Sequence, residues 1–340
     1  FWAQRIRLTA DVGNETGVSG RLSLLSALQW GLDESPVQEN RLAVQEGYID
    51  IASDTLRLRT GRQEVSLGSQ RLVGTRDGTN VRRNWEGFRA TGSFTDWTVE
   101  AIYLNLVGVE PSGAFNDRRL DERLLSGIYF TRSGDWSNFD LYYLYSDVEE
   151  KLTIAGPGSQ RRHSLGARMF GERGPWFWNW EAVYQWGDHE EEEIRAWTLA
   201  SNTGYRIDAP WSPALMLSVN IASGDSDPDD GKLETFDALY PRGNYFSDLA
   251  QLGPANFFNL NPYLTFSPAA NVAVSLDVNF YWRLEEEDGI YGPPGNLIRL
   301  PGGSDERFVN TAISLSVGWQ ISEHWFAGVS LAHSIPEAFI

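Results

Sequence analysis

The sequence predicts an all-β protein, a transmembrane antiparallel up-and-down β-barrel of about 16 strands, with about 18 possible. Apolar and polar residues alternate along the chain, most clearly over residues 272–282, where every second residue is Val, Leu, Phe or Trp. The residues between them include Asp277 and Asn279. A period of two is that of a β-strand. Because a charged face suits a water-filled lumen and an apolar face suits lipid, we expect residues 1–340 to form one barrel domain.

The composition is compatible with this fold. The chain contains 14 Trp, a residue type that prefers the membrane–water interface. No apolar run approaches the roughly 18 residues of a membrane-spanning helix. Cysteine is absent, which excludes disulfides and cysteine-ligated metals. The chain opens at Phe1 without a visible signal peptide, so we expect a mature protein of the bacterial outer membrane whose export signal has been removed.

The alternating segments are each near the ~9–11 residues that a tilted membrane strand needs. Their two faces separate most clearly over residues 162–170, where Arg162, Ser164, Gly166 and Arg168 form the lumen side. In chain order, the predicted strands are residues 4–13, 20–30, 42–51, 55–65, 84–94, 97–107, 124–132, 138–148, 162–170, 176–187, 194–205, 214–223, 257–266, 272–284, 309–321 and 325–334.

The connections between these strands alternate in length. Short turns contain Asp54, Thr95-Asp96, Gly134-Asp135, Pro268-Ala269 and Ser322-Glu323. Longer polar segments span residues 33–40, 108–123, 149–161, 188–193, 224–256 and 285–308. Outer-membrane barrels have short periplasmic turns and long extracellular loops. We therefore expect the longer segments to be extracellular and both chain termini to lie on the periplasmic side.

One predicted strand, residues 55–65, contains a conflict. Arg57 and Arg59 face the lumen and the intervening leucines face lipid, but Arg62 shares the parity of the leucines. A basic residue that faces lipid at mid-bilayer costs about 2–4 kcal/mol. Either the strand leaves the membrane before Arg62, or Gly61 marks a bulge that resets the register.

Arginine is concentrated in the segment 61–87, which also contains several glycines. One interpretation is that this segment folds inward over residues 66–84 and constricts the lumen, so that its guanidinium groups select for anions. The alternative is an external loop whose arginines bind lipopolysaccharide phosphate. The sequence leaves both interpretations open.

Two motifs resemble the signature of a known family. The first comprises Gly61-Arg62-Gln63, Gly68, Gln70-Arg71-Leu72, Asn80, Arg83 and Gly87. The second runs from Thr235 through Pro241-Arg242 to Phe246, and is followed by Leu252-Gly-Pro-Ala-Asn256 and Pro262. On these residues the chain resembles the alginate-export family of outer-membrane β-barrel porins, and the hairpin pattern is compatible over the rest of the chain.

This resemblance implies a monomeric barrel that passes a polyuronate such as alginate through an arginine-rich constriction. Both the motifs and the residue pattern supply candidates for substrate contacts in the lumen. They are Arg62, Arg71, Arg83 and Arg242 from the motifs, and Arg76, Arg82 and Arg168 from the residue pattern.

Acidic residues give a net charge of −18 and cluster in the segments expected to be loops. Asp225, Asp227 and Asp229 alternate like the ligands of a calcium loop. However, Gly231 stands one position late, and Phe236 occupies the place of the final Glu. These three residues are a candidate for a weak Ca²⁺ site, and the alternative is a solvated loop tip. No other cofactor is expected.

The sequence favours a channel over an enzyme. The four histidines lack metal-ligand spacing, and no nucleophile motif, glycine-rich phosphate loop or nucleic-acid surface is recognisable. We expect passive passage of anionic or polar saccharides, with alginate-like polyuronates favoured. The expected partners are that saccharide, membrane lipid and lipopolysaccharide, with a periplasmic protein as a further candidate. The alternative is a plugged structural or adhesive barrel whose acidic loops bind a partner or divalent cations.

Overall fold

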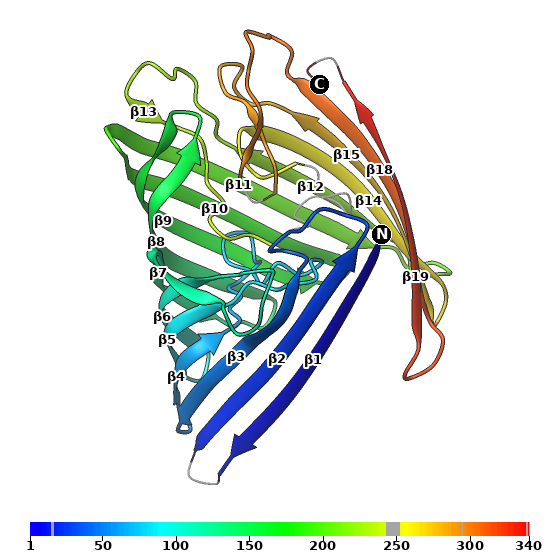
Figure 1. Cartoon of the computed structure of the whole chain (residues 1–340). Coiled ribbons are helices and arrows are strands. Elements are labelled where there is room, and N and C mark those ends of the chain that lie inside the picture. The colour runs from blue at the N-terminus through cyan, green and yellow to red at the C-terminus, as the bar shows by residue number, and fades with distance from the viewer. Residues whose placement is uncertain (15–16, 243–251, 294, 338, 340) are drawn as a thin grey trace.

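The computed structural model confirms the all-β prediction and describes residues 1–14, 17–242, 252–293, 295–337 and 339. One sheet of 17 strands, all but one of them long, curves into a barrel wall (Figure 1). Each long strand pairs antiparallel with the next long strand along the chain, which is the up-and-down order that the sequence predicts. No helix in the described part of the chain is long and apolar enough to span a membrane.

The long strands correspond one to one with the predicted segments. They are β1 (Trp2–Gly13), β2 (Val18–Trp30), β3 (Asn40–Ala52), β4 (Leu56–Gln63), β5 (Trp85–Ser93), β6 (Trp97–Gly108), β7 (Arg118–Arg132), β8 (Ser137–Thr153), β9 (Gly156–Arg173), β10 (Trp176–His189), β11 (Glu192–Arg206), β12 (Ala214–Ala222), β14 (Phe257–Ala269), β15 (Val272–Trp282), β18 (Phe308–Gln320) and β19 (Phe326–Pro336). The short strands are β13 (Lys232–Leu233), β16 (Ile290–Tyr291) and β17 (Leu297–Arg299).

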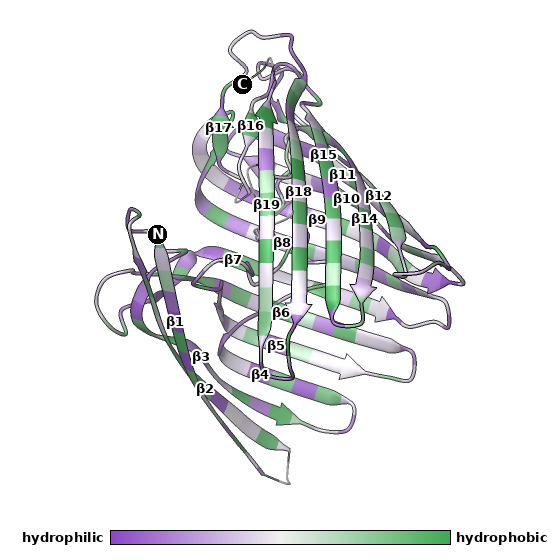
Figure 2. Ribbon diagram, turned by 90° about the vertical axis from the view of Figure 1, so that its right-hand side faces the viewer, coloured by the Kyte–Doolittle hydropathy of each residue, from purple (hydrophilic) through white to green (hydrophobic). Residues whose placement is uncertain are grey.

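The two faces of the wall differ in polarity, as the alternation predicts. Leu165 and Tyr184 are exposed on the outer face, whereas Arg162 and Gln185 of the same two strands are buried on the inner face. Figure 2 shows the resulting bands of hydrophobic and hydrophilic residues along the strands. Aromatic rings gather at the short-turn ends of the strands, where they suit a membrane interface, and include Trp97, Trp136, Trp176, Trp319 and Trp325.

The two edges of the sheet are β1 and β19. In the described residues β1 pairs only with β2 and β19 only with β18, and Figure 2 shows the two edge strands apart. A short connection follows β1 and another precedes β19. Consequently β1 begins, and β19 ends, on the side of the long loops (Figure 1). The expectation that both termini lie with the short turns is therefore wrong.

Two of the predicted loops are strands. β8 and β9 continue to a turn at residues 154–155, where the sequence predicts a loop over 149–161. β10 and β11 continue to a turn at residues 190–191, in place of the predicted loop over 188–193. Beyond the membrane the outer face of a hairpin meets water in place of lipid, so the hydropathy alternation fades although backbone pairing continues. Polar composition alone therefore predicts loops too early.

Candidate functional site

Two of the long connections fold into the lumen and bind one another. They are residues 64–84, between β4 and β5, and residues 223–242, after β12; together they are called the insert. Val73 and Tyr240 form a parallel bridge between them. Gly74 N donates to Tyr240 O over 2.9 Å, and Tyr240 N donates to Leu72 O over 2.9 Å. The residues of the second family motif at 243–246 lie outside the described residues.

The insert packs an apolar cluster against the inner face of the wall. Trp85 is fully buried, and its ring meets that of Tyr240 edge-on, with 4.6 Å between ring centroids. Leu104 of β6 and Leu125 of β7 belong to the same buried cluster, as do Leu72 and other insert residues. Residues 66–84 therefore lie inside the barrel, and the interpretation of this segment as an inward loop is confirmed.

The tip of the first loop docks on the inner wall. Ser69 Oγ donates to Glu181 of β10 over 2.5 Å, and Tyr142 OH of β8 donates to the same carboxylate over 2.7 Å. Gly68 has a φ of +51° and lies so close to Tyr129 of β7 that an added Cβ would stand 2.0 Å from the phenol oxygen. Only glycine fits this left-handed position without displacing the tip.

The far end of the same loop docks under β1 and β2. The Asn80 side-chain amide donates to the carbonyl oxygens of Gln4, Leu28 and Gln38, with N···O distances of 3.0, 3.3 and 3.0 Å. Arg5 of β1 also donates to Thr79 O over 3.2 Å. The loop is therefore held against the wall at both ends, which keeps the insert in one position across the lumen.

Arg76 and Arg83 are brought together at the long-loop end. Both line a cavity of about 440 Å³ between the insert and β6–β8, together with Arg123, Lys151, Leu239 and Tyr240. This cavity is called the mouth pocket. Burial lowers the pKa of Arg76 to about 10 and that of Arg83 to about 9.

The charges of the mouth pocket are unbalanced. Arg83 donates to the carbonyl oxygens of Gly74 and Tyr240, and Arg76 donates to Val81 O, but neither pairs with a carboxylate in the described part of the chain. Its acidic lining residues are Glu122 and Asp237, and Asp237 is already paired with Lys151 at 2.7 Å. Guanidinium groups therefore outnumber the carboxylates left to neutralise them.

Arg71 and Arg168 are held by carboxylates of the inner wall. Arg71 Nη1 lies 3.4 Å from Glu181, and Arg168 Nη1 lies 2.9 Å from Asp140. Both arginines are on the lumen side, as predicted. Their charges are neutralised by carboxylates of the wall, and neither residue lines the mouth pocket.

Arg82 and Arg242 also lie outside the mouth pocket. Arg82 bridges Glu64 at 3.3 Å and Asp77 at 2.7 Å. Arg242 N donates to Gln70 O over 3.1 Å, at the point where the two loops of the insert meet. The predicted arginines therefore do not form one group. Of these residues, Arg76 and Arg83 line the same cavity, whereas Arg71, Arg82 and Arg168 are in separate ion pairs.

The placement of Arg62 in the lumen is wrong. β4 pairs without a register shift with β3 and β5, so Arg62 faces outward like the exposed Leu56 and Leu58. Its Nε donates to Glu86 over 2.8 Å on the same face. Of the two explanations that the sequence left open, a bulge at Gly61 is excluded. Arg62 sits near the long-loop end of β4 and is neutralised there by a carboxylate.

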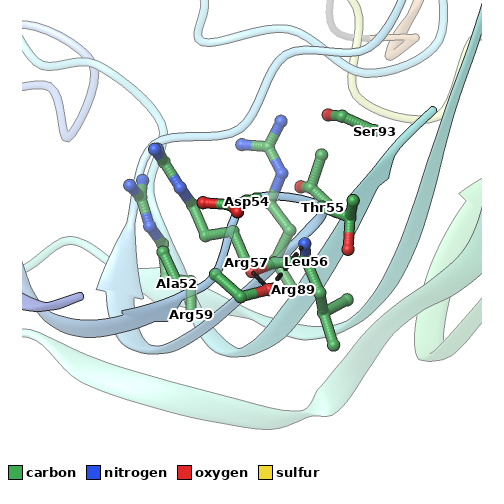
Figure 3. A pocket seen from close by; sticks show the side chains of 10 residues that line it. Ala52, Asp54, Thr55, Leu56, Arg57, Arg59, Arg89 and Ser93 are labelled. Carbon is green, nitrogen blue, oxygen red and sulfur yellow. Dashed lines mark hydrogen bonds between the residues drawn. The ribbon is translucent and has the colours of Figure 1, made fainter. Parts of the chain in front are cut away.

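Sequence reasoning missed a second group of inward arginines at the opposite end of the barrel. Arg57, Arg59 and Arg89 line a cavity of about 370 Å³ beside the short β3–β4 turn (Figure 3). This cavity is called the turn-end pocket. Strand parity already points Arg57 and Arg59 inward, but only the pairing of β4 with β5 adds Arg89.

The candidate calcium site is not formed. Asp225 Oδ1 accepts a hydrogen bond from Asp227 N over 3.3 Å, and Asp227 Oδ1 accepts one from Asp229 N over 3.2 Å. The carboxylates of Asp225 and Asp227 thus each bind the backbone two residues further on, and the three side chains do not converge. The described residues include no group of three or more His, Cys, Asp or Glu that could hold a metal ion. The prediction of a Ca²⁺ site at Asp225, Asp227 and Asp229 is therefore wrong.

Asp225 instead joins two extracellular loops through Asp288. Asp288 Oδ2 accepts hydrogen bonds from Asp225 N over 2.9 Å and from Thr235 Oγ1 over 2.6 Å, while Tyr291 OH donates to Oδ1 over 2.6 Å. Both aspartates are almost fully buried. Burial, together with the nearby charge of Asp288, raises the pKa of Asp225 to about 7.

We expect this contact to weaken as the pH rises. Since folding raises the pKa of Asp225 from 3.8 to about 7, the stability of the folded loops falls between these values and levels off above them. The ionised Asp225 then repels Asp288 and Glu234. Hydrogen-exchange protection of residues 223–235 should be higher near pH 5 than near pH 8.

The variant Asp225→Asn should remove this pH difference. Asp230→Asn is the matched control, because Asp230 is paired with Lys232 on the surface and its pKa is lowered. That control should retain the pH difference. Equal protection of the wild-type loops at the two pH values would contradict the assignment.

Comparisons with known proteins agree with this geometry. A family model described as "Alginate export" matches residues 2–340. Acinetobacter baumannii OccAB3 has a similar structure, with a TM-score of 0.65, 10% identity, and coverage of 98% of this chain and 86% of that chain. Pseudomonas aeruginosa OccK2 (OpdF), solved in complex with glucuronate, has a TM-score of 0.65 and 10% identity, and the match covers 99% of this chain and 86% of that chain. Pseudomonas aeruginosa OpdK with vanillate has a TM-score of 0.67 and 12% identity, and the match covers 100% of this chain and 89% of that chain. Such identities show a shared fold only. No curated protein matches the chain.

Proposed function

Because the chain belongs to the alginate export family, we propose that it is a passive channel for anionic saccharides, with alginate-like polyuronates favoured. It is an outer-membrane β-barrel of the porin type, and its family is one of transport proteins and not of enzymes.

The unbalanced charge of the mouth pocket is the observation that carries the proposal. Among the residues that the structure describes, the buried Arg83 and the half-buried Arg76 have no carboxylate partner, and the side chain of Arg123 makes no ion pair or hydrogen bond. A carboxylate that enters the pocket replaces water at these groups with charge-assisted hydrogen bonds. Contacts of this kind select anions, provided that each is weak enough for the solute to leave.

The position of the insert supports such contacts with a passing solute. The insert occupies the lumen next to the mouth pocket, is hydrogen-bonded to β1, β2 and β10, and packs against β7 and β8. Two similar barrels were solved with glucuronate and with vanillate, which are both carboxylates. These relatives support an anionic solute for this chain.

Neutralising the mouth pocket should remove the preference for anions. In the double variant Arg76→Gln/Arg123→Gln we expect uptake of a uronate disaccharide into proteoliposomes to fall by about tenfold, since charge-assisted contacts are lost. Uptake of a neutral disaccharide should not change. Arg62→Gln is the matched control, because it removes an arginine of the outer face. If the double variant still discriminates like the wild type, the mouth pocket is not the selective site.

A plugged structural barrel is the second candidate. The apolar cluster that joins the insert to β5–β8 favours it, because a tightly packed lumen carries no solute. Ion conductance separates the two candidates. A plugged barrel carries no current in a planar bilayer, whereas the proposed channel does.

A further inference from the structure

The turn-end pocket lies at the opposite end of the barrel from the mouth pocket. It is formed by the β3–β4 turn at residues 53–55 and by the short-turn halves of β4 and β5. Its volume is about 370 Å³. Figure 3 shows the side chains of Arg57, Arg59 and Arg89 extending to the same side of the sheet.

Two of the three arginines are fixed by carboxylates. Arg59 binds Asp50 through Nε and Nη2, each over 2.7 Å, and its guanidinium lies 3.7 Å from the centroid of the Tyr48 ring. Arg89 Nε donates to Glu100 over 2.6 Å. These pairs are electrically neutral, so they shape the pocket and leave its recognition chemistry to other groups.

Arg57 is the arginine that remains available. Its side chain is exposed and makes no ion pair or hydrogen bond with any residue in the described ranges. On the inner face its neighbours across the strands are Ala52 and Thr91. Thr55 and Ser93 add further hydroxyl groups to the lining, and Asp54 adds a carboxylate.

We propose that the turn-end pocket is a second binding site, for one uronate unit of a saccharide. Arg57 binds the carboxylate of the sugar, a charge-assisted contact that guanidinium groups make well. Asp54 accepts hydrogen bonds from sugar hydroxyls, and the hydroxyls of Thr91 and Ser93 bind others. Among the residues that the structure describes, the pocket places the unpaired guanidinium of Arg57 beside the carboxylate of Asp54, so it suits a singly charged polyol better than a small inorganic anion.

This inference deepens the proposed function, since it adds a site at the other end of the route, but the site can be measured without any flow. The test is the affinity of the detergent-solubilised full chain for glucuronate, measured by calorimetry alongside glucose and acetate. The variants are Arg57→Gln, which removes the free cation, and Thr91→Val, which removes a hydroxyl at nearly constant volume.

Arg132→Gln is the matched control, because Arg132 ends β7 at the same end of the barrel and lies beside Trp97 on the outer face. We expect glucuronate to bind at least about tenfold more tightly than glucose or acetate, and Arg57→Gln to lose about tenfold in affinity. Thr91→Val should lose less, and Arg132→Gln nothing. Equal glucuronate affinity in Arg57→Gln and wild type would overturn the site, as would equal binding of glucose.

The two proposals fail separately. If Arg57→Gln leaves glucuronate affinity unchanged while Arg76→Gln/Arg123→Gln abolishes selective uptake, only the turn-end site falls. If glucuronate binding depends on Arg57 while the channel passes neutral and anionic sugars equally, the mouth pocket loses its role and the turn-end site stands.

Discussion

Replacing Arg83 with methionine should loosen the insert and raise the single-channel conductance. Arg83 Nη1 donates to Gly74 O over 2.9 Å, to Pro241 O over 3.2 Å and to Tyr240 O, so one buried guanidinium joins both loops. Tyr240 O keeps Gly74 N as a donor, but the carbonyl groups of Gly74 and Pro241 lose the Arg83 contact, and a buried carbonyl left without a donor costs about 1–3 kcal/mol. We expect the two loops to separate, and the wider lumen to give a larger and noisier current.

Two further variants distinguish the charge of Arg83 from its clamping role. Arg83→Lys keeps the charge, but its side chain is shorter, so its ammonium does not reach the position of Nη1, the atom that contacts all three carbonyl groups; anion selectivity should persist while the current becomes noisy. Arg82→Met is the matched control, because Arg82 is more exposed and pairs with the half-buried Glu64 and the exposed Asp77. Its effect should stay below about 1 kcal/mol. Unchanged conductance and unchanged proteolysis of residues 64–84 in Arg83→Met would refute the clamp.

Gly68→Ala should displace the tip of the first loop from the wall. The new methyl group would meet the Tyr129 phenol oxygen at 2.0 Å. Tyr129 cannot move aside freely, because its OH donates to Asp140 over 2.6 Å and its ring stacks on Tyr142 with 4.9 Å between centroids. Overpacking of this kind costs about 1–3 kcal/mol, and the left-handed backbone adds about 1–2 kcal/mol. Hydrogen exchange over residues 66–72 should accelerate accordingly.

Gly78→Ala provides the control within the same loop. Gly78 also has a positive φ, of +101°, but an added Cβ there has no neighbour within 4 Å. This variant carries the backbone strain without the clash, so exchange at residues 66–72 should remain near that of wild type. Similar acceleration in both variants would show that strain matters and that contact with Tyr129 does not.

The alternation of apolar and polar residues was sufficient to predict every long strand of the wall. Lipid imposes a strict side for each residue, so the pattern is strong wherever a strand crosses the membrane. The same signal fails outside the membrane, which is why the hairpin ends at residues 149–153 and 156–161 were predicted as loop. Strand parity correctly indicated that Arg62 faces outward, because uninterrupted pairing of β4 places it on the outer face.

The candidate site could be predicted only in part. The glycines and arginines of the segment 61–87 indicated an inward loop, but nothing local predicts that it binds residues 223–242. Arg83 and Tyr240 are far apart in sequence, and their contact depends on the curvature of the whole barrel. Likewise, Arg123 was missed because residues 108–123 were predicted as a loop, whereas the structure places Arg123 in β7, on the inner face.

The single-channel current of the wild-type protein in a planar bilayer under a salt gradient, with and without oligouronate, tests the central claim most directly. The account predicts an open pore whose reversal potential indicates anion selectivity and whose current is blocked by the oligouronate. A neutral oligosaccharide of equal length should block it far less. A current that is cation-selective and indifferent to uronates, or no current at all, would contradict the assignment of the mouth pocket as the selective passage.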